Sequence, residues 1–235
     1  LKAFTLPALW EELPMPFVPT ADGQVYRTRA IKYEWAPDVY LAFIWRYDPA
    51  AEVRQTELAV SRDNRRWTTF GTAPAYLPAG LLFGDGRRAN AALAAHGLVR
   101  RDDEIWQYAE VCEAGHGGPG VQRLIRVTQR LDGFVSLAAT RTGGWAVTHP
   151  LIFEGSALEL NVAAAGPVRV GLLDTDGQPI PGFGGDDCLP ITTDATHYRV
   201  RWQGGDDVSS LAGRPVRLRF ELTDARIYAF QFTGR

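Results

Sequence analysis

Short runs of apolar and β-branched residues, separated by turn residues, recur along the first 140 positions and restrict the chain to a fold built from β-strands. One set of four runs covers residues 25–33, 39–47, 56–62 and 66–70, and a second covers 91–99, 104–112, 121–129 and 134–139. Pro, Gly, Asp or Asn bounds each run, which is typical of strands in antiparallel sheets. The pattern predicts two antiparallel four-stranded sheets in an all-β protein.

The two sets follow one another like a repeat, since residues 39–43 correspond to 105–109 and the turn at 62–64 to that at 131–133. Repeated four-stranded meanders are typical of β-propeller blades, and a propeller ring needs about four to eight blades. We therefore expect residues 1–139 to form a partial β-propeller of about two blades. Missing N-terminal blades would leave apolar surface around Phe17, Val25 and Ile31 exposed. An open pair of sheets is the alternative.

After residue 140 the runs become longer and the hairpins clearer. Six runs cover 144–153, 157–164, 168–174, 198–203, 216–222 and 227–232. Residues 174–177, Asp-Thr-Asp-Gly, are a strong turn signal, and residues 216–222 alternate apolar and polar side chains like a half-buried strand. We expect a β-sandwich over residues 140–235.

Composition excludes several classes of protein. Hydrophobic residues make up 46% of the chain, including 7 Trp, 8 Tyr and 11 Phe, which is too many for a disordered chain. No apolar run approaches the roughly 18 residues of a membrane span. With 25 basic and 27 acidic residues the net charge is −2, so no general basic field is available for nucleic acid. We expect neither a membrane nor a nucleic-acid partner. The sequence leaves the compartment open, with secretion or the periplasm compatible with it.

Cysteines and histidines give no pattern of metal ligands. Cys112 and Cys188 lie far apart, and we expect two buried free thiols rather than a disulfide or a zinc knuckle. The four histidines lack metal-ligand spacing, which leaves calcium on Asp and Asn loops as the alternative. Neither a dinucleotide fingerprint nor a Gly-x-Ser-x-Gly elbow is present, so no metal and no cofactor are predicted.

Four motifs resemble a known family: RLDGFVSL at 130–137, THPL at 148–151, DGQPIPGF at 176–183 and IYAFQF at 227–232. Together they are similar to the C-terminal half of bacterial glycosidase-like proteins that join a five-bladed propeller to a β-sandwich. The likeness extends over residues 125–235, and more loosely over 25–124, where the turn at Ser61-Arg62-Asp63 followed by Trp67 is similar to blade hairpins. The resemblance implies carbohydrate chemistry, with catalytic carboxylates projecting into a central funnel. None of the four motifs is itself catalytic.

Glu110 is the first candidate for chemistry, because it lies with Glu113 in an aromatic and apolar strand. There a carboxylate would be desolvated, as a general acid requires. Trp106, Tyr108 and Glu110 alternate along one face, which we expect to point inward and line the funnel. The alternative is a structural carboxylate paired with an arginine such as Arg126.

Asp38 is the second catalytic candidate, and Trp35, Trp106, Tyr108 and His116 are the candidates for sugar binding. Asp38 follows Trp35 in a loop crowded with aromatic residues, which suits ring stacking and hydrogen bonding to a sugar. His116 lies among glycines that allow close approach to a ligand. The alternatives are a turn aspartate beside a proline, a flexible hairpin tip and tryptophans that fill the core.

These features favour a carbohydrate-active protein that hydrolyses glycosidic bonds by acid/base carboxylates, with a glycan as its partner. The alternative is a non-catalytic glycan-binding or structural module that belongs to a larger propeller protein. A pair of carboxylates across an aromatic-lined cleft would support the enzyme. A surface without such a pair would support the module.

Overall fold

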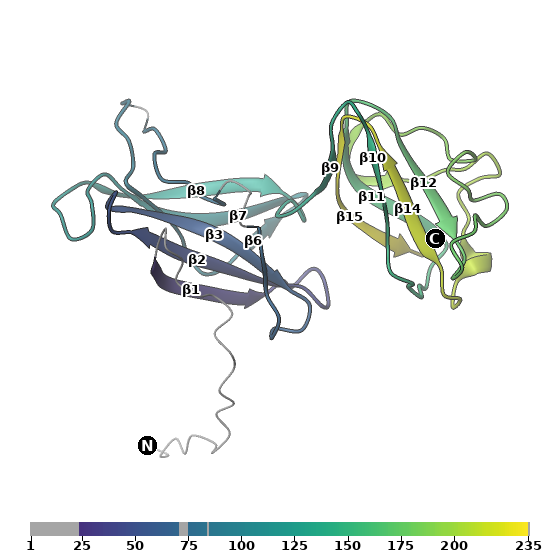
Figure 1. The fold of residues 1–235 in the computed structure, drawn as a ribbon, viewed down its shortest axis with the longest axis horizontal. Helices are drawn as coiled ribbons and strands as arrows, with labels where there is room; N and C mark the ends of the chain where they lie inside the picture. Colours follow the sequence, from purple (N-terminus) through teal and green to yellow (C-terminus); the bar gives the residue numbers. More distant parts are fainter. Residues whose placement is uncertain (1–23, 71–74, 84, 235) are drawn as a thin grey trace, which may run out of the picture. The chain divides into compact units, whose positions relative to one another are not determined.

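The computed structural model describes residues 24–70, 75–83 and 85–234 (Figure 1). This part of the chain is all-β, with about half of it in strands, no α-helix and one short 3₁₀ helix, η1 (Ser209–Leu211). The strands form three sheets, one of them mixed, and the described residues contain no propeller and no closed barrel. None of the helices in this part of the chain is long and apolar enough to cross a membrane. The all-β prediction is confirmed.

The chain divides into two compact units. The first takes in the described residues up to Val99 together with Trp106–Thr128, and the second takes in Arg100–Ile105 and the residues from Gln129 onward. An eight-stranded mixed sheet, which the first unit largely supplies, has the order β1-β2-β3-β5-β7-β6, with β4 beside β3 and β8 beside β7. Its strands are β1 (Gln24–Lys32), β2 (Tyr40–Asp48), β3 (Val53–Ser61), β4 (Thr68–Thr69), β5 (Ala91–Ala94), β6 (Val99–Arg101), β7 (Glu104–Cys112) and β8 (Gln122–Arg130).

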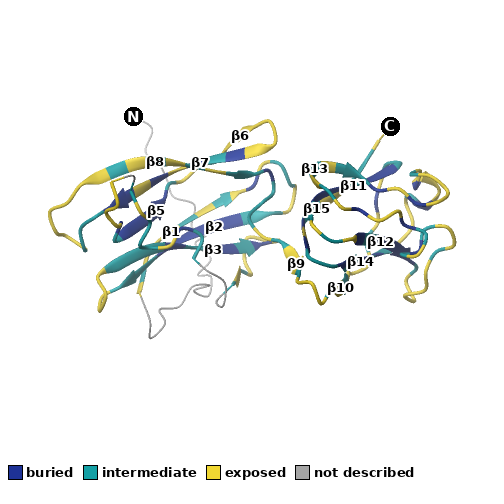
Figure 2. Ribbon diagram, turned by 90° about the horizontal axis from the view of Figure 1, so that it is seen from above, coloured by how far each residue is buried: buried dark blue, intermediate teal, exposed yellow. Residues whose placement is uncertain are grey.

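The expectation of two separate antiparallel four-stranded sheets is wrong. Strands from both predicted sets lie in this one sheet, because β5 pairs in parallel with β3 at Arg54 and Ala91. A parallel neighbour requires a long connection, and the chain between β4 and β5 is long enough to supply it. All four residues of β5 are buried, as in a strand covered on both faces (Figure 2).

The core of the first unit surrounds β2, in which Leu41–Trp45 are all buried. Ala42 and Ile44 pack with Ala59 on one face, where half-buried Val25 joins them. On the other face Trp45 packs against Leu93 of β5 and Cys112 of β7, and its Nε1 donates a hydrogen bond of 3.0 Å to the carbonyl oxygen of Ala94. Of the surface expected to be exposed, Val25 and Ile31 are half-buried and Phe17 lies outside the described residues.

The second unit has two antiparallel sheets on one hydrophobic core. One has the order β10-β14-β12 and the other β13-β11-β15-β9. Their strands are β9 (Leu137–Ala139), β10 (Gly144–Val147), β11 (Ala157–Ala164), β12 (Val168–Leu173), β13 (Asp194–Arg199), β14 (Arg217–Leu222) and β15 (Ala225–Thr233). Alternation along β14 buries Leu218, Phe220 and Leu222, as predicted. The predicted turn also forms, because Asp174 Oδ1 accepts hydrogen bonds from the backbone of Asp176 and Gln178.

Two short segments of the second unit lie outside its own two sheets, Arg100–Ile105 and residues 130–131. Buried and charged side chains join them to β11 and β13. Asn161 of β11 is buried. Its Nδ2 donates a hydrogen bond of 2.6 Å to the carbonyl oxygen of Leu131, and its Oδ1 accepts one of 2.8 Å from Nε of Arg130. Asp103 accepts a hydrogen bond from the Thr196 hydroxyl and lies 3.2 Å from Nε2 of His197, both on β13. The contacts of Asp103 join Arg100–Ile105 to β13, in agreement with its place in the second unit.

Candidate functional site

Two of the predicted residues, Trp35 and Asp38, lie in the turn between β1 and β2, but their contacts are with different neighbours. Asp38 lies 3.7 Å from Arg62 in an ion pair whose side chains are 66% and 78% exposed. Such exposed pairs contribute little to stability. The Trp35 ring packs edge-to-face on buried Tyr33, with 5.1 Å between ring centroids. No contact in the described part of the chain links Asp38 to Glu110.

Trp106, Tyr108 and Glu110 share one face of β7, as their spacing predicts, but that face is not buried. The opposite face of β7 is the buried one and consists of Ile105, Gln107, Ala109 and Val111. On the predicted face Tyr108 is 44% exposed and Glu110 is exposed. The expectation that this face points inward is therefore wrong, and Glu110 lacks the burial that would desolvate it. The Arg126 guanidinium lies over the Trp106 ring at 4.1 Å rather than beside Glu110.

His116 is the predicted residue that the fold brings into a cluster. Its ring packs edge-to-face on Tyr26 of β1 and on Tyr47 of β2, with centroid distances of 5.2 and 5.0 Å. The two tyrosine rings are 6.4 Å apart. Tyr26 and His116 are exposed and Tyr47 is half-buried. This aromatic trio gives the first unit an accessible group of rings with polar edges.

The loop between β7 and β8 presents His116 and depends on glycine at specific positions. Gly117 has φ +79°, a left-handed conformation that favours glycine. A side chain at Gly115 would collide with the carboxylate of Glu52, so this loop passes directly over the turn that joins β2 to β3. At Gly120 a side chain would meet the backbone nitrogen of Ala114 at 2.9 Å.

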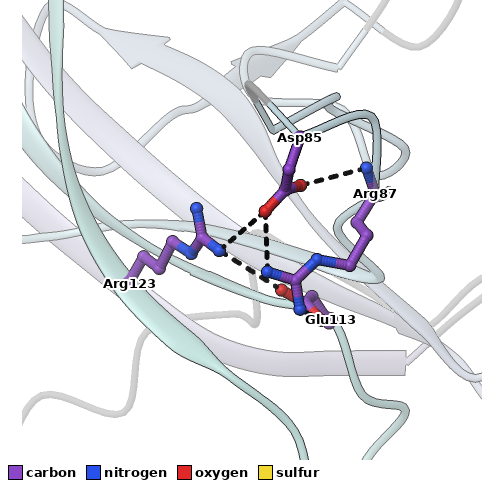
Figure 3. Close-up of polar contacts among 4 residues, drawn as sticks. All are labelled: Asp85, Arg87, Glu113 and Arg123. Atoms are coloured by element: carbon purple, nitrogen blue, oxygen red, sulfur yellow. Dashed lines mark hydrogen bonds and ion pairs between the residues drawn. The ribbon is translucent and has the colours of Figure 1, made fainter.

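A charged network begins in the same loop, three residues before His116. Figure 3 shows Arg87 and Arg123 reaching the carboxylates of Asp85 and Glu113. Arg87 lies 2.7 Å from both Asp85 Oδ2 and Glu113 Oε2, while Arg123 lies 3.2 Å from Asp85 and 3.8 Å from Glu113. The Arg123 guanidinium also stacks over the Phe83 ring at 4.5 Å.

The arginines of this charged network keep Asp85 ionised. Hydrogen bonds from the side chain and backbone of Arg87, and a further one from Arg123, hold the pKa of Asp85 well below its usual range. The same pairing raises the pKa of Arg87 above its ordinary value. Asp85 is therefore an anion at neutral pH and cannot donate a proton there.

Glu113 is the more enclosed of the two carboxylates, with a side chain only 18% exposed. Its Oε2 accepts the hydrogen bond from Arg87, whereas its Oε1 is buried and accepts none. Arg123, which is 37% exposed, lies 3.8 Å from this Oε1. The network can hold loops together or receive a polar ligand. Asp85, held ionised by the two arginines, does not provide the protonated carboxyl that hydrolysis of a glycosidic bond requires.

Sequence reasoning included His116 and Glu113 but missed Asp85, Arg87, Arg123 and the two tyrosines. Asp85 and Arg87 lie in a loop rich in Gly, where the sequence gives turn signals and no sign of ion pairs. Tyr26 and Tyr47 lie in strands, where aromatic residues are common and indicate strand structure first. Only the fold shows that the glycine loop passes across β1 and β2.

The second unit contains an open groove of about 770 Å³ with a floor of alanines from β9, β11 and β15. Arg141, Arg226, Asp194, Asp224 and Tyr228 line it. None of the predicted site residues lies there. Arg130 holds Asp194 at 2.7 Å and stacks over Tyr228 at 4.5 Å, so part of the lining has a structural role.

Both cysteines are buried and free, as predicted, and burial raises the pKa of the Cys188 thiol. Among the described residues no group of three or more His, Cys, Asp or Glu side chains is placed to hold a metal ion. No protein-family model matches the chain, and no curated protein matches it. The likeness to propeller glycosidases thus rests on the sequence motifs alone.

Proposed function

We propose that this chain is a carbohydrate-binding protein that holds a glycan at the aromatic trio of Tyr26, Tyr47 and His116. The observation that carries the proposal is the packing of His116 against both tyrosines at an accessible surface. Aromatic rings offer an apolar surface to the C–H groups of a sugar, and the hydroxyl and imidazole groups offer hydrogen bonds to its oxygens. The glycine loop lets the backbone approach a ligand closely.

Binding without hydrolysis fits the carboxylates better than catalysis does. Glycoside hydrolysis needs one carboxyl that is protonated and a second that is ionised on the other side of the bond. Asp85 and Glu113 are both paired with arginines, and Asp38 lies in an exposed ion pair with Arg62. The proposal is therefore the non-catalytic alternative.

Calorimetric titration of the purified chain with neutral oligosaccharides tests this function. We expect His116→Ala to weaken binding about two- to tenfold, because one lost aromatic contact is worth roughly 0.5–1.5 kcal/mol. His149→Ala removes an exposed histidine in the second unit and serves as the matched control, with unchanged affinity expected. Equal affinities for wild type and His116→Ala would contradict the assignment, as would failure of the wild type to bind any glycan.

Hydrolysis is the second candidate, because Glu110 is accessible beside Trp106 and Tyr108 and because of the family resemblance. If Glu110 is the proton donor, Glu110→Gln should keep the melting temperature and lower the rate on arabino-, xylo- or fructosides about 10²-fold or more. Unchanged turnover on any glycoside that the wild type cleaves would exclude that role.

The resemblance also implies a partial propeller at 1–139 followed by a β-sandwich at 140–235. Two antiparallel sheets on a shared core support the sandwich. The mixed eight-stranded sheet gives no support to separate blades.

A further inference from the structure

Two arginines of β1 lie over the same tryptophan ring beside the aromatic trio. Arg27 and Arg29 place their guanidinium carbons 5.2 and 4.7 Å from the centroid of Trp45. They are two residues apart on one face of the strand, and their partners in β2 are Trp45 and Phe43. Trp45 is only 7% exposed, and it also packs against Leu93 and Cys112.

Neither member of this arginine pair has an acidic partner in the part of the chain that the structure describes. Other arginines of the first unit do, such as Arg46, which lies 2.8 Å from Glu57, and both arginines of the charged network. The Nε of Arg29 is buried and donates no hydrogen bond. Arg54, which pairs with Tyr47 in the sheet, also has a buried Nε without an acceptor.

This arrangement is electrostatically incomplete. Two like charges on one strand face repel each other, and a buried donor without an acceptor costs free energy. Stacking on Trp45 offsets part of that cost and leaves the N–H edges of the guanidinium groups available. A planar guanidinium binds carboxylate or sulfate oxygens through two parallel hydrogen bonds.

We propose that Arg27 and Arg29, assisted by Arg54, bind the anionic group of an acidic glycan, a carboxylate or a sulfate ester. The inference rests on the proposed function, since Tyr26 adjoins Arg27 in β1 and Tyr47 follows Trp45 on the same face of β2. A sugar on the aromatic trio therefore has these cations beside it. Charge complementarity therefore favours an anionic ligand. A nucleic-acid backbone needs many phosphate contacts, whereas a local group of three arginines in a chain of net charge −2 suits one or two anionic groups.

Calorimetric titration of the full chain with three hexasaccharides tests the proposal. The probes are an oligogalacturonate, a chondroitin sulfate fragment and neutral xylohexaose, which separate carboxylate from sulfate and both from neutral sugar. We expect at least one acidic probe to bind about tenfold or more tightly than xylohexaose, and this preference to weaken with added salt.

The double variant Arg27→Gln, Arg29→Gln should bind the acidic probe as weakly as the neutral one while retaining the wild-type affinity for xylohexaose. Arg141→Gln, which removes an exposed arginine of the second unit, is the control and should keep the preference. Arg29→Lys keeps the charge but loses the planar fork and should lie between wild type and the double variant. If the double variant does not fold, Arg27→Gln alone, at an exposed position, gives the same comparison.

Three outcomes would overturn the inference. Equal affinity for acidic and neutral probes would refute the anion site while leaving the proposed glycan binding unaffected. Binding of inorganic sulfate or citrate with no preference among the glycans would show an ion site unrelated to sugar. Tighter binding of single-stranded DNA than of either acidic glycan would identify a nucleic-acid site instead. No glycan binding by the wild type would refute the proposed function itself.

Discussion

Asp85 accepts hydrogen bonds from both the backbone and the side chain of Arg87, two residues along the chain. These bonds and the one from Arg123 favour the ionised carboxyl, so the pKa of Asp85 in the folded protein lies below its value in the unfolded chain, which is about 3.9. When the pKa of a carboxyl is lower in the folded protein, its contribution to stability is fully present at pH values above the unfolded-state pKa. That contribution disappears as the pH falls through the folded-state pKa.

An NMR titration of the Asp85 carboxyl carbon measures this effect directly. We expect wild-type Asp85 to stay ionised at about pH 3, and Arg87→Gln to move the midpoint upward toward about 3.9. Arg123→Gln should move it less, since Arg87 provides the stronger hydrogen bonds. A midpoint that is the same in wild type and Arg87→Gln would contradict the role given to Arg87.

Single residues also show where sequence reasoning succeeds and where it stops. The alternation of Trp106, Tyr108 and Glu110 was predictable, because successive side chains of a strand point to opposite faces. Which face is buried was not, because that depends on the neighbours of β7 in the sheet. His116 was identified from its glycine neighbours. Its tyrosine partners are about 70 or more positions away in sequence, beyond the reach of local patterns.

The loop between β7 and β8 holds its course because Gly120 lies against the backbone of Ala114. A methyl group at Gly120 would meet the Cβ of Ala114 at 2.6 Å and its backbone nitrogen at 2.9 Å, and backbone cannot rotate away. We expect Gly120→Ala to lower the free energy of unfolding by about 1–3 kcal/mol and to weaken glycan binding, because the loop that carries His116 must shift.

Gly118→Ala is the matched control for this loop. Its methyl group would contact Ala114 at an ordinary 3.5 Å, so we expect a change within about 0.5 kcal/mol and unaltered binding. Urea unfolding and calorimetric titration of both variants make the comparison. If the two alanine variants behave alike, the close approach at Gly120 does not position the loop.

Most strands were predictable from alternation and turn residues, as β1, β2, β7 and β8 illustrate. Their assembly was not. Residues 91–94 read as the beginning of a longer run, whereas the fold ends β5 after four buried residues and places it parallel to β3. Such pairing follows from contacts between distant segments, and the repeat seen in the sequence carried no information on the order of strands within the sheet.

At the scale of the molecule, the two units have separate hydrophobic cores, and the proposed glycan site lies in the first. Leu160 of β11 is 1% exposed in the core of the second unit, and Phe43 of β2 is fully buried in the first. Truncating either to alanine leaves a cavity, at a cost of about 2–5 kcal/mol for leucine and about 3–5 kcal/mol for phenylalanine. We therefore expect calorimetry to resolve two unfolding transitions. Leu160→Ala should lower one and Phe43→Ala the other.

Glycan titration at a temperature below both transitions tests whether the site depends on the first unit alone. Leu160→Ala should retain the wild-type affinity, because Tyr26, Tyr47 and His116 all belong to the first unit. Phe43→Ala should weaken binding, since Phe43 is buried in β2 and is the strand partner of Arg29. Equal loss of affinity in the two variants, or a single transition that both lower together, would mean that the units fold as one and that the site depends on both.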